Sequence, residues 1–325
     1  MTDPRVTVVV PTHNRPALLT ETLAGLRSQD LPIPDYEIVV VDDGSKPPVQ
    51  IPRFVGGPEV GLIRLGGSER STARNVGAAA ARGELLVFVD DDMSVGPNFL
   101  TQYLHAHAQW PDTLLVGATE LPAEARRKPF GRFRYRLERQ GVPTACGPVG
   151  AANFCAAGNM AIPRHQFLTL GGFDSELASG EDQDLALRHS ASGRRIVFVP
   201  GAAAVHRDRA MDVRGYCRRH EWGAEQLLPF CRRYPEWPDN VIRAQVNGLA
   251  GPADGAVGRL RKGMKSLLAG PAVTEILFVA CSYLERTAPD SRLLDKLYHV
   301  LLGTHIFRGY RRGIARSQQA TRRVA

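Results

Sequence analysis

Three aspartates, Asp90, Asp91 and Asp92, stand directly after the apolar run LLVFV. Such a run is typical of a buried strand, so we expect the carboxylates at the rim of a sheet and not on a solvated helix face. Oxygen ligands at alternate positions suit Mg²⁺ or Mn²⁺, which bind through one or two carboxylates together with substrate phosphates. The triplet therefore predicts a metal–diphosphate site; taken alone, it is also compatible with a simple acidic turn.

A second strand-like run, EIVVV, also ends in acids, at Asp42 and Asp43, followed by a Gly-Ser pair. One of these carboxylates is placed to accept from a base N–H or a ribose hydroxyl, and glycine permits close approach of the backbone. An Asx turn is the alternative. Arg74 and Asn75, early in the next helical pattern, are candidates to direct polar groups at phosphate or base; on its own, Arg74 is equally compatible with a surface cation.

These residues need elements that bring them together. Continuous apolar runs at 6–10, 38–41 and 85–89 alternate with helical patterns at 16–29 and 71–82. Strands without polar alternation are expected in a parallel sheet covered on both faces, so the order predicts a doubly wound α/β fold. Ligands of such sheets bind beyond the carboxyl ends of the strands. The polar loops at 12–15, 42–45 and 90–92 are thus expected to line one cleft.

Four segments match a known pattern. VVVPTHNR, EIVVVDDGS, STARNVGAAAARGELLVFVDDD and GGFDSELASGEDQDLALR occur in the order seen in family 2 glycosyltransferases, and the chain resembles that family over residues 5 to 210. The resemblance implies a GT-A catalytic domain at 1–210, with a Rossmann-like, mostly parallel sheet. Its nucleotide-sugar half would span about 1–120 and its acceptor half about 150–210, followed by a helical region at 211–325. It also implies an inverting transfer of a sugar from a nucleoside diphosphate, with UDP as the expected nucleotide, to an acceptor hydroxyl.

The resemblance also assigns the residues that would hold the donor. The nucleotide-sugar side would comprise Pro11, Thr12, Asn14, Arg15, Asp42, Asp43, Arg74, Asp90, Asp91, Gly158 and Asn159. Asp90 and Asp92 would form the DxD signature, with Asp92 as the first ligand of Mn²⁺ or Mg²⁺. His206, after the strand-like VFVPGAAAV, would complete the metal site, and neutral imidazole beside carboxylates is a suitable environment for Mn²⁺.

The segment GEDQDLALR resembles the motif that supplies the catalytic base of the family. The matching aspartate is Asp182; Glu181 and Asp184 are its rivals, and Glu181 and Asp174 would face the acceptor. A carboxylate near the acceptor hydroxyl removes its proton as the oxygen attacks the anomeric carbon. Three acids at the start of a helix are also explained by the favourable helix dipole, which remains the structural alternative.

Composition and the absence of certain motifs argue against other classes of protein. The net charge of +8 suits an anionic partner, but the chain has no aromatic stacking platform or motif typical of nucleic-acid binding. No GxGxxG follows a strand, as an oxidoreductase would require, and PTHNR replaces the glycine-rich loop of a nucleotidyltransferase. A non-catalytic protein that binds nucleotide sugars or carbohydrate is the alternative to the enzyme. The acceptor is expected to be a saccharide, a lipid-linked sugar or a small molecule.

The sequence also predicts where in the cell the chain is located. The start MTDPRVTVVV lacks the features of a secretory signal, and the five cysteines are odd in number and widely spaced, so we expect reduced thiols in the cytoplasm. A basic stretch at 123–150 is expected to be an irregular, mobile acceptor loop. Apolar residues in the basic C-terminal part recur at helical spacings, at Leu260, Met264, Leu267, Leu293, Leu297 and Leu301. They would either complete a core or contact the inner face of a membrane peripherally.

Overall fold

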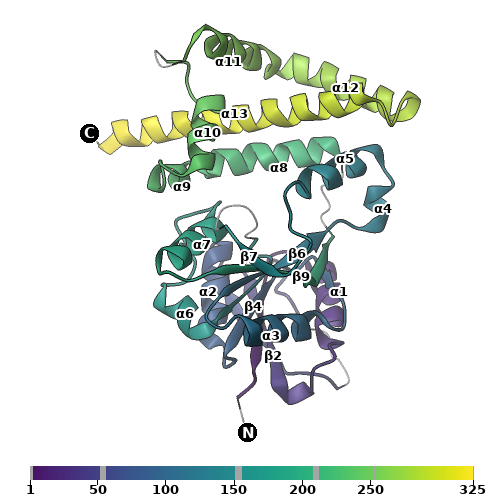
Figure 1. Ribbon diagram of the computed structural model, residues 1–325, viewed down its shortest axis with the longest axis vertical. Helices are drawn as coiled ribbons and strands as arrows, with labels where there is room; N and C mark the ends of the chain where they lie inside the picture. The colour runs from purple at the N-terminus through teal and green to yellow at the C-terminus, as the bar shows by residue number, and fades with distance from the viewer. Residues whose placement is uncertain (1–2, 52–55, 151–155, 208–211, 252–253, 325) are drawn as a thin grey trace. The chain divides into compact units, whose positions relative to one another are not determined.

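The computed structural model describes residues 3–51, 56–150, 156–207, 212–251 and 254–324. The chain forms two compact units (Figure 1). The first, here called the sheet unit, comprises residues 1–122 and 141–207. The second, the helical unit, comprises residues 123–140 and 208–325. The prediction placed residues 123–140 in the first domain, whereas here they belong to the helical unit.

A nine-stranded sheet forms the centre of the sheet unit, in the order β3-β2-β1-β4-β8-β6-β9-β5, with β7 beside β9. The strands are β1 (Val6–Thr12), β2 (Tyr36–Asp43), β3 (Val60–Leu65), β4 (Leu85–Val89), β5 (Met93–Val95), β6 (Leu114–Glu120), β7 (Gly147–Val149), β8 (Asn159–Pro163) and β9 (Ile196–His206). Every residue of β1, β2 and β4 is buried. These are the three apolar runs that the sequence assigned to strands.

Helices cover both faces of this sheet. They are α1 (Pro16–Arg27), α2 (Arg70–Ala80), α3 (Phe99–Gln109), α6 (Arg164–Thr169) and α7 (Glu181–Ala191). One core contains Leu23 of α1 and Tyr103 of α3, and a second core on the other face contains Ala78 of α2, Phe167 of α6 and Leu185 of α7. Burial of both faces explains why the strands carry continuous apolar runs. The α/β fold with a helical C-terminal region is confirmed.

The strand directions agree with the predicted, mostly parallel sheet and add three antiparallel strands. β3, β2, β1 and β4 are parallel, as expected for strands joined by crossover helices. In the second half β8 runs antiparallel to both β4 and β6, and β5 and β7 run antiparallel to β9. Because β6 runs parallel to β9, the strands β1, β2, β3, β4, β6 and β9 share one direction, and only β5, β7 and β8 oppose it, so the sheet is mixed but mostly parallel. The sequence did not reveal the antiparallel strands, because β5, β7 and β8 have only three to five residues and no crossover helix marks their direction.

The helical unit consists of α4 (Ala123–Arg126), α5 (Pro129–Glu138), α8 (Val213–Gln226), α9 (Leu228–Arg233), α10 (Pro238–Asn247), α11 (Ala256–Leu268), α12 (Pro271–Thr287) and α13 (Arg292–Val324). Aromatic side chains of α5, Phe130 and Phe133, pack with Tyr216, Phe278 and Tyr298 in its core. The expected irregular loop at 123–150 is thus partly wrong: two helices lie within it, and they are held by burial of their apolar side chains.

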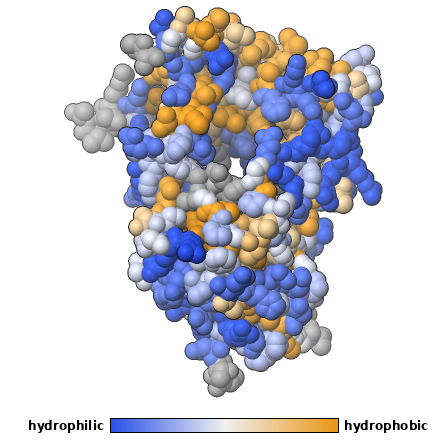
Figure 2. All heavy atoms as spheres, viewed as in Figure 1, coloured by the Kyte–Doolittle hydropathy of each residue, from blue (hydrophilic) through white to orange (hydrophobic). Residues whose placement is uncertain are grey.

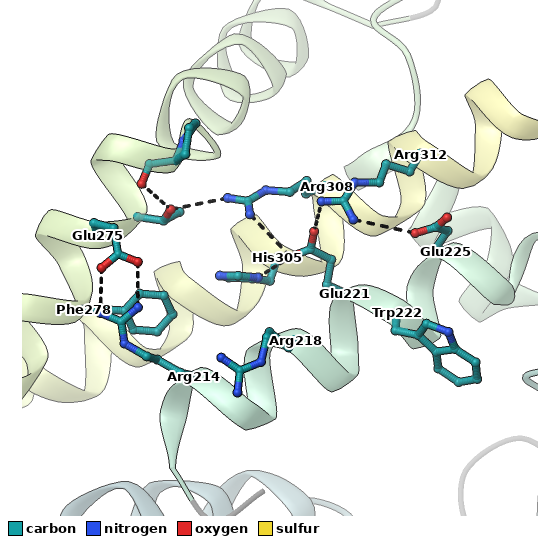
Figure 3. Close-up of a pocket in the computed structure, with 12 residues that line it drawn as sticks. Arg214, Arg218, Glu221, Trp222, Glu225, Glu275, Phe278, His305, Arg308 and Arg312 are labelled. Atoms are coloured by element: carbon teal, nitrogen blue, oxygen red, sulfur yellow. Dashed lines mark hydrogen bonds and ion pairs between the residues drawn. The ribbon is translucent and has the colours of Figure 1, made fainter.

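A cavity of about 460 Å³ lies within the helical unit, between α8, α12 and α13 (Figure 3). Its polar lining consists largely of paired charges. The buried Glu221 carboxylate accepts from His305 and Arg312, and its Oε2 lies 3.5 Å from Arg308 Nη1. Arg214 binds both oxygens of Glu275 at 2.6 and 2.7 Å. The carboxylate of Glu221 therefore joins α8 to α13.

Replacing Glu221 with alanine is expected to destabilise the helical unit by about 1–3 kcal/mol. The change leaves the buried His305 without its acceptor and leaves Arg308 and Arg312 facing each other. We expect less than the full cost of breaking a buried ion pair, because Arg312 is half-exposed and can turn to water. Glu236→Ala, at an exposed acid of the same unit, is the control.

Urea unfolding monitored by tryptophan fluorescence measures this effect. Two of the three tryptophans, Trp222 and Trp237, lie in the helical unit, so the signal reports mainly on its unfolding. Equal midpoints for the Glu221 and Glu236 variants would show that the buried carboxylate does not stabilise the helix pairing.

The described cysteines Cys146, Cys217, Cys231 and Cys281 are free thiols. Cys155 lies outside the described residues.

Candidate active site

The acid triplet lies at the carboxyl end of β4 and is held by residues from the end of β1. Thr12 Oγ1 donates to Asp91 Oδ2 at 2.7 Å, and Arg15 Nη1 lies 3.3 Å from Asp91 Oδ1 and 3.0 Å from Asp92 Oδ2. Burial raises the pKa of Asp91 to about 6, although Thr12 and Arg15 oppose the shift. The convergence of these two loops, expected from parallel strand order, is confirmed.

Asp92 faces His206 across the strand pair β5–β9. The register sets Met93 opposite His206, and His206 Nε2 lies 3.2 Å from Asp92 Oδ1. Asp92 Oδ1 is buried and accepts no hydrogen bond. A buried acceptor without a donor is costly unless something else satisfies it. The two side chains proposed as metal ligands are therefore neighbours, with one carboxylate oxygen available.

Arg74, from α2, links the triplet to α7. Its side chain is 2% exposed, which rules out a surface cation. Nη2 donates to Asp90 Oδ1 at 2.7 Å, and Nη1 donates to Glu181 Oε1 at 3.2 Å. Burial alone would raise the pKa of Asp90, but the positive charges of Arg74 and Arg70 outweigh it and hold this pKa below its ordinary value. Asp90 is therefore an ionised partner of Arg74.

The three acids at the start of α7 have different surroundings. Glu181 pairs with Arg74, and the fully buried Asp184 pairs with Arg188 at 2.7 Å. Asp182 forms no ion pair within the described part of the chain and is only partly buried. Its Oδ1 accepts from the Gln183 N–H at 2.8 Å and its Oδ2 from the Ala157 N–H at 3.4 Å.

Crowding by protein atoms, together with the negative charge of Glu181, raises the pKa of Asp182 to about 7. A carboxyl group with a pKa near neutrality is suited to exchange a proton during a reaction. Of the three candidates for the base in this motif, Asp182 is thus the one whose carboxylate forms no ion pair with an arginine. The helix-dipole explanation accounts for acids at this position but not for the difference among them.

The acids after β2 build the local turn. Asp42 accepts from the backbone N–H groups of Ser45 at 3.0 Å and Val49 at 2.9 Å, one on each oxygen. Burial acts to raise its pKa, but these bonds outweigh it and lower the pKa. Asp43 Oδ1 accepts from the N–H and hydroxyl of Ser68 at 2.6 and 2.7 Å. Asp42 therefore serves the turn, as the Asx-turn alternative anticipates, whereas Asp43 ties it to the loop after β3.

The turn after β2 requires glycine where it approaches the loop after β3. Gly44 has φ +77°, and a Cβ built there would lie 2.6 Å from the backbone nitrogen of Gly67. Asn14, also at positive φ, accepts from the Lys46 N–H through Oδ1 at 2.7 Å, and its own backbone N–H donates to the Ser45 hydroxyl oxygen at 2.8 Å. Asn14 thus joins the end of β1 to the turn after β2.

Two more predicted donor-side residues come from the segment before and within β8. A Cβ at Gly158 would lie 2.5 Å from Asp90 Oδ2, so glycine makes room for that carboxylate. Asn159 is fully buried: its Oδ1 accepts from the Tyr103 hydroxyl at 2.7 Å, and its Nδ2 donates to two backbone carbonyls. Asn159 thus holds strands together, and its amide does not face the triplet.

The last two predicted positions have local roles. Pro11 is buried within β1, opposite Val41 of β2. Asp174 Oδ1 accepts from the Glu176 N–H at 2.8 Å in the loop that leads to α7. The structure also adds Arg70, whose charge acts on Asp90 and which the sequence analysis missed. Its spacing of four residues from Arg74 places both on one side of α2, which was the available signal.

Within the described ranges, no three His, Cys, Asp or Glu side chains converge as a ready-made metal cage. The site instead offers the pair formed by Asp92 and His206.

Comparison with known proteins finds one family model that matches the chain in part. The model of Glycosyl transferase family 2 matches residues 7–152, which span the loops after β1, β2 and β4. Residues 7–152 are thus similar to family 2 glycosyltransferases. Among curated relatives, the pre-mycofactocin glycosyltransferase of Mycobacterium tuberculosis is 26% identical over 238 residues. The validoxylamine A glucosyltransferase of Streptomyces hygroscopicus subsp. jinggangensis is 29% identical over 266 residues.

Each alignment covers 71% of this chain but only 48% and 60% of the respective relative. Solved structures agree on the fold. Mannosyltransferase PcManGT of Pyrobaculum calidifontis, in complex with GDP-Man and Mn²⁺, has a TM-score of 0.56 at 20% identity, covering 95% of this chain and 88% of that chain. TarS 1–349 of S. aureus has a TM-score of 0.51 at 18% identity, covering 95% and 92%. A further structure of this TarS fragment holds UDP-GlcNAc, with a TM-score of 0.50. The GT-A fold is thus confirmed.

Proposed function

We propose that this protein transfers a sugar from a nucleoside diphosphate to an acceptor hydroxyl with inversion at the anomeric carbon. The observation that carries the proposal is the Arg74 bridge. One guanidinium binds Asp90 of the acid triplet and Glu181 of α7, and so holds Asp182, which follows Glu181, beside the triplet. A donor-binding side and a basic carboxylate thereby share one site, as single-displacement transfer requires.

Asp92 and His206 are the residues we propose for Mn²⁺ or Mg²⁺. The pair fits such an ion because Asp92 Oδ1 is buried without a hydrogen bond and faces His206 Nε2 at 3.2 Å. Asp90 is a weaker candidate, since Arg74 already occupies its Oδ1. Two protein ligands are sufficient where diphosphate oxygens supply others. When bound, the ion would neutralise the charge of the departing diphosphate.

Asp182 is the proposed general base. It would take the proton of the acceptor hydroxyl while the oxygen attacks the anomeric carbon from the side opposite the nucleotide. The bond from that carbon to the diphosphate oxygen breaks in the same step, so no covalent sugar–enzyme intermediate is needed. Arg15 and Arg74 would position the triplet: Arg15 orients Asp91 and Asp92, and Arg74 orients Asp90.

The nucleotide we propose is UDP, although the relatives support more than one base. TarS 1–349 was solved with UDP-GlcNAc and PcManGT with GDP-Man and Mn²⁺. The acceptor class is a saccharide, a lipid-linked sugar or a small molecule; the name of one relative offers validoxylamine A as a concrete trial acceptor.

A donor screen tests the proposed function. We expect the purified chain to release nucleoside diphosphate from one member of a panel of UDP-, GDP- and dTDP-sugars when Mn²⁺ or Mg²⁺ and the acceptors are present. Chelation with EDTA should abolish this release, and added metal should restore it. If calorimetry shows that a donor binds but no acceptor supports its turnover, the result would favour a non-catalytic binding protein. If the folded protein with metal neither binds any donor nor releases nucleoside diphosphate, the assignment is refuted.

A further inference from the structure

Helix α11 of the helical unit has its apolar side in solvent. Val257, Leu260, Met264 and Leu267 are 63%, 65%, 53% and 76% exposed. Their spacing of three or four residues places them in one stripe along the helix. A helix of a soluble domain normally buries such a stripe, so this arrangement is inverted.

The residue that α11 buries is a lysine. Lys262 is 6% exposed, and its Nζ binds both oxygens of Asp254 at 2.8 Å and the Leu249 carbonyl at 3.1 Å. Lys265 likewise binds Val246 and Asn247 through Nζ, at 3.2 and 3.1 Å. Polar contacts thus fix the helix with its apolar stripe turned outward. The sequence allowed either a core or a membrane role for these leucines; here the α11 set does not form core, whereas Leu301 of α13 is fully buried.

Neighbouring helices extend this exposed surface. Helix α11 contacts α10 and α12. On α12, Ile276, Val279 and Tyr283 are 66%, 65% and 66% exposed and also follow helical spacing. Figure 2 shows hydrophobic residues on the visible face of the helical unit, over the positions that α10, α11 and α12 occupy in Figure 1. Exposed apolar residues gathered on neighbouring helices are typical of an interaction site.

We propose that this surface, defined by the outward residues of α11 and α12, binds the interface of a membrane that contains anionic lipids. Charge favours this occupant. The helical unit has 27 Lys and Arg against 13 Asp and Glu, a net +14, whereas the sheet unit has 14 against 20, a net −6. Helix α11 itself contains four cations and no acid, with Arg259 and Arg261 beside the stripe.

An apolar stripe flanked by cations is the pattern of a helix that lies in a bilayer interface, with its apolar side among acyl chains and its cations at headgroup phosphates. A second copy of the chain fits less well. A two-fold contact would set the same cations of α11 against one another, and charged residues are depleted at the core of dimer interfaces.

The surface would hold the protein on the bilayer without crossing it. Within the described residues no single helix is long and apolar enough to span a membrane. The pair α11 and α12 reaches the required apolar length together, but it is bent by 78°. Both helices carry their exposed apolar residues on one side only, whereas a helix that spans a bilayer is apolar around its circumference.

Co-sedimentation of the full chain with lipid vesicles tests this proposal. We expect binding to phosphatidylcholine vesicles that contain phosphatidylglycerol to exceed binding to pure phosphatidylcholine by at least about tenfold, and to weaken as salt rises. The double change Leu260→Ser/Leu267→Ser should lower binding at least about tenfold. The change Arg259→Gln/Arg261→Gln should reduce the preference for phosphatidylglycerol.

The matched control is Ile33→Ser/Leu168→Ser, at apolar residues of the sheet unit that are 55% and 45% exposed. It should bind vesicles like the wild type. Equal binding to both lipid compositions, or unchanged binding after the leucine substitutions, would overturn the proposal. A dimer in light scattering that the leucine substitutions dissociate would also overturn it, by identifying self-association. Because nucleotide release is measured without vesicles, a negative result here leaves the transferase assignment intact.

Discussion

Replacing Asp182 with asparagine is expected to lower kcat by about 10²–10⁴-fold, the usual contribution of a general base. Asparagine keeps the size of the side chain and keeps an oxygen for the Gln183 N–H. It cannot take a proton from the acceptor. Donor binding should change little, since Arg74 contacts Glu181 and not Asp182. Initial rates of nucleoside diphosphate release with the acceptor present measure this effect.

The pH profile of the wild type provides an independent readout for the same residue. With a pKa of about 7, Asp182 is ionised only above neutrality, so kcat/KM should fall about tenfold per pH unit below about pH 7. Glu176→Gln, at an exposed acid in the loop that leads to α7, is the matched control and should retain both rate and profile. A pH-independent wild type, or an Asp182→Asn variant with unchanged kcat, would show that the base lies elsewhere.

Stability measurements separate loss of chemistry from loss of fold. The pKa of Asp182 is raised in the folded protein from its ordinary value of 3.8 to about 7. The folded state therefore holds the proton more tightly than the unfolded state, and stability falls as pH rises through this window. Asp182→Asn removes that loss. Its Tm should match the wild type at about pH 4 and exceed it at about pH 8.

Replacing Asp92 with asparagine is expected to lower kcat by about a thousandfold, since a metal supplies several kcal/mol of charge stabilisation. The substitution keeps an oxygen for Arg15 but places a neutral amide beside His206. The concentration of Mn²⁺ that gives half-maximal activity should therefore rise. A titration of activity with Mn²⁺ measures both effects in one experiment.

Glu84→Gln is the control for Asp92, because Glu84 is an exposed acid just before β4, the strand that leads to the triplet. It should leave both kcat and the Mn²⁺ requirement unchanged. An Asp92→Asn variant that retains the wild-type rate and metal dependence would refute the assignment of Asp92 as a metal ligand. A loss of activity without any change in metal dependence would assign Asp92 to positioning through Arg15.

The apolar runs of the sequence were sufficient to predict the first half of the fold. Continuous apolar runs identify buried strands because both faces of a parallel sheet are covered, and the runs at β1, β2 and β4 are completely buried. Parallel order then fixed which loops meet, and the Thr12–Asp91 hydrogen bond confirms that they do. The order of motifs also indicated the family whose model matches residues 7–152, because four segments in register are far more specific than any one of them.

The roles of the residues within each motif depend on tertiary contacts, which the sequence does not show. Asp42 and Asp43 are identical in type, yet one completes a turn and the other holds a loop. Likewise Glu181, Asp182 and Asp184 share a helix start, but only partners distant in sequence, such as Arg74, distinguish them. Helical spacing showed that α11 is amphipathic, but the position of Lys262 decided that its apolar side faces outward. Spacing records which residues share a side, whereas burial depends on what packs against that side.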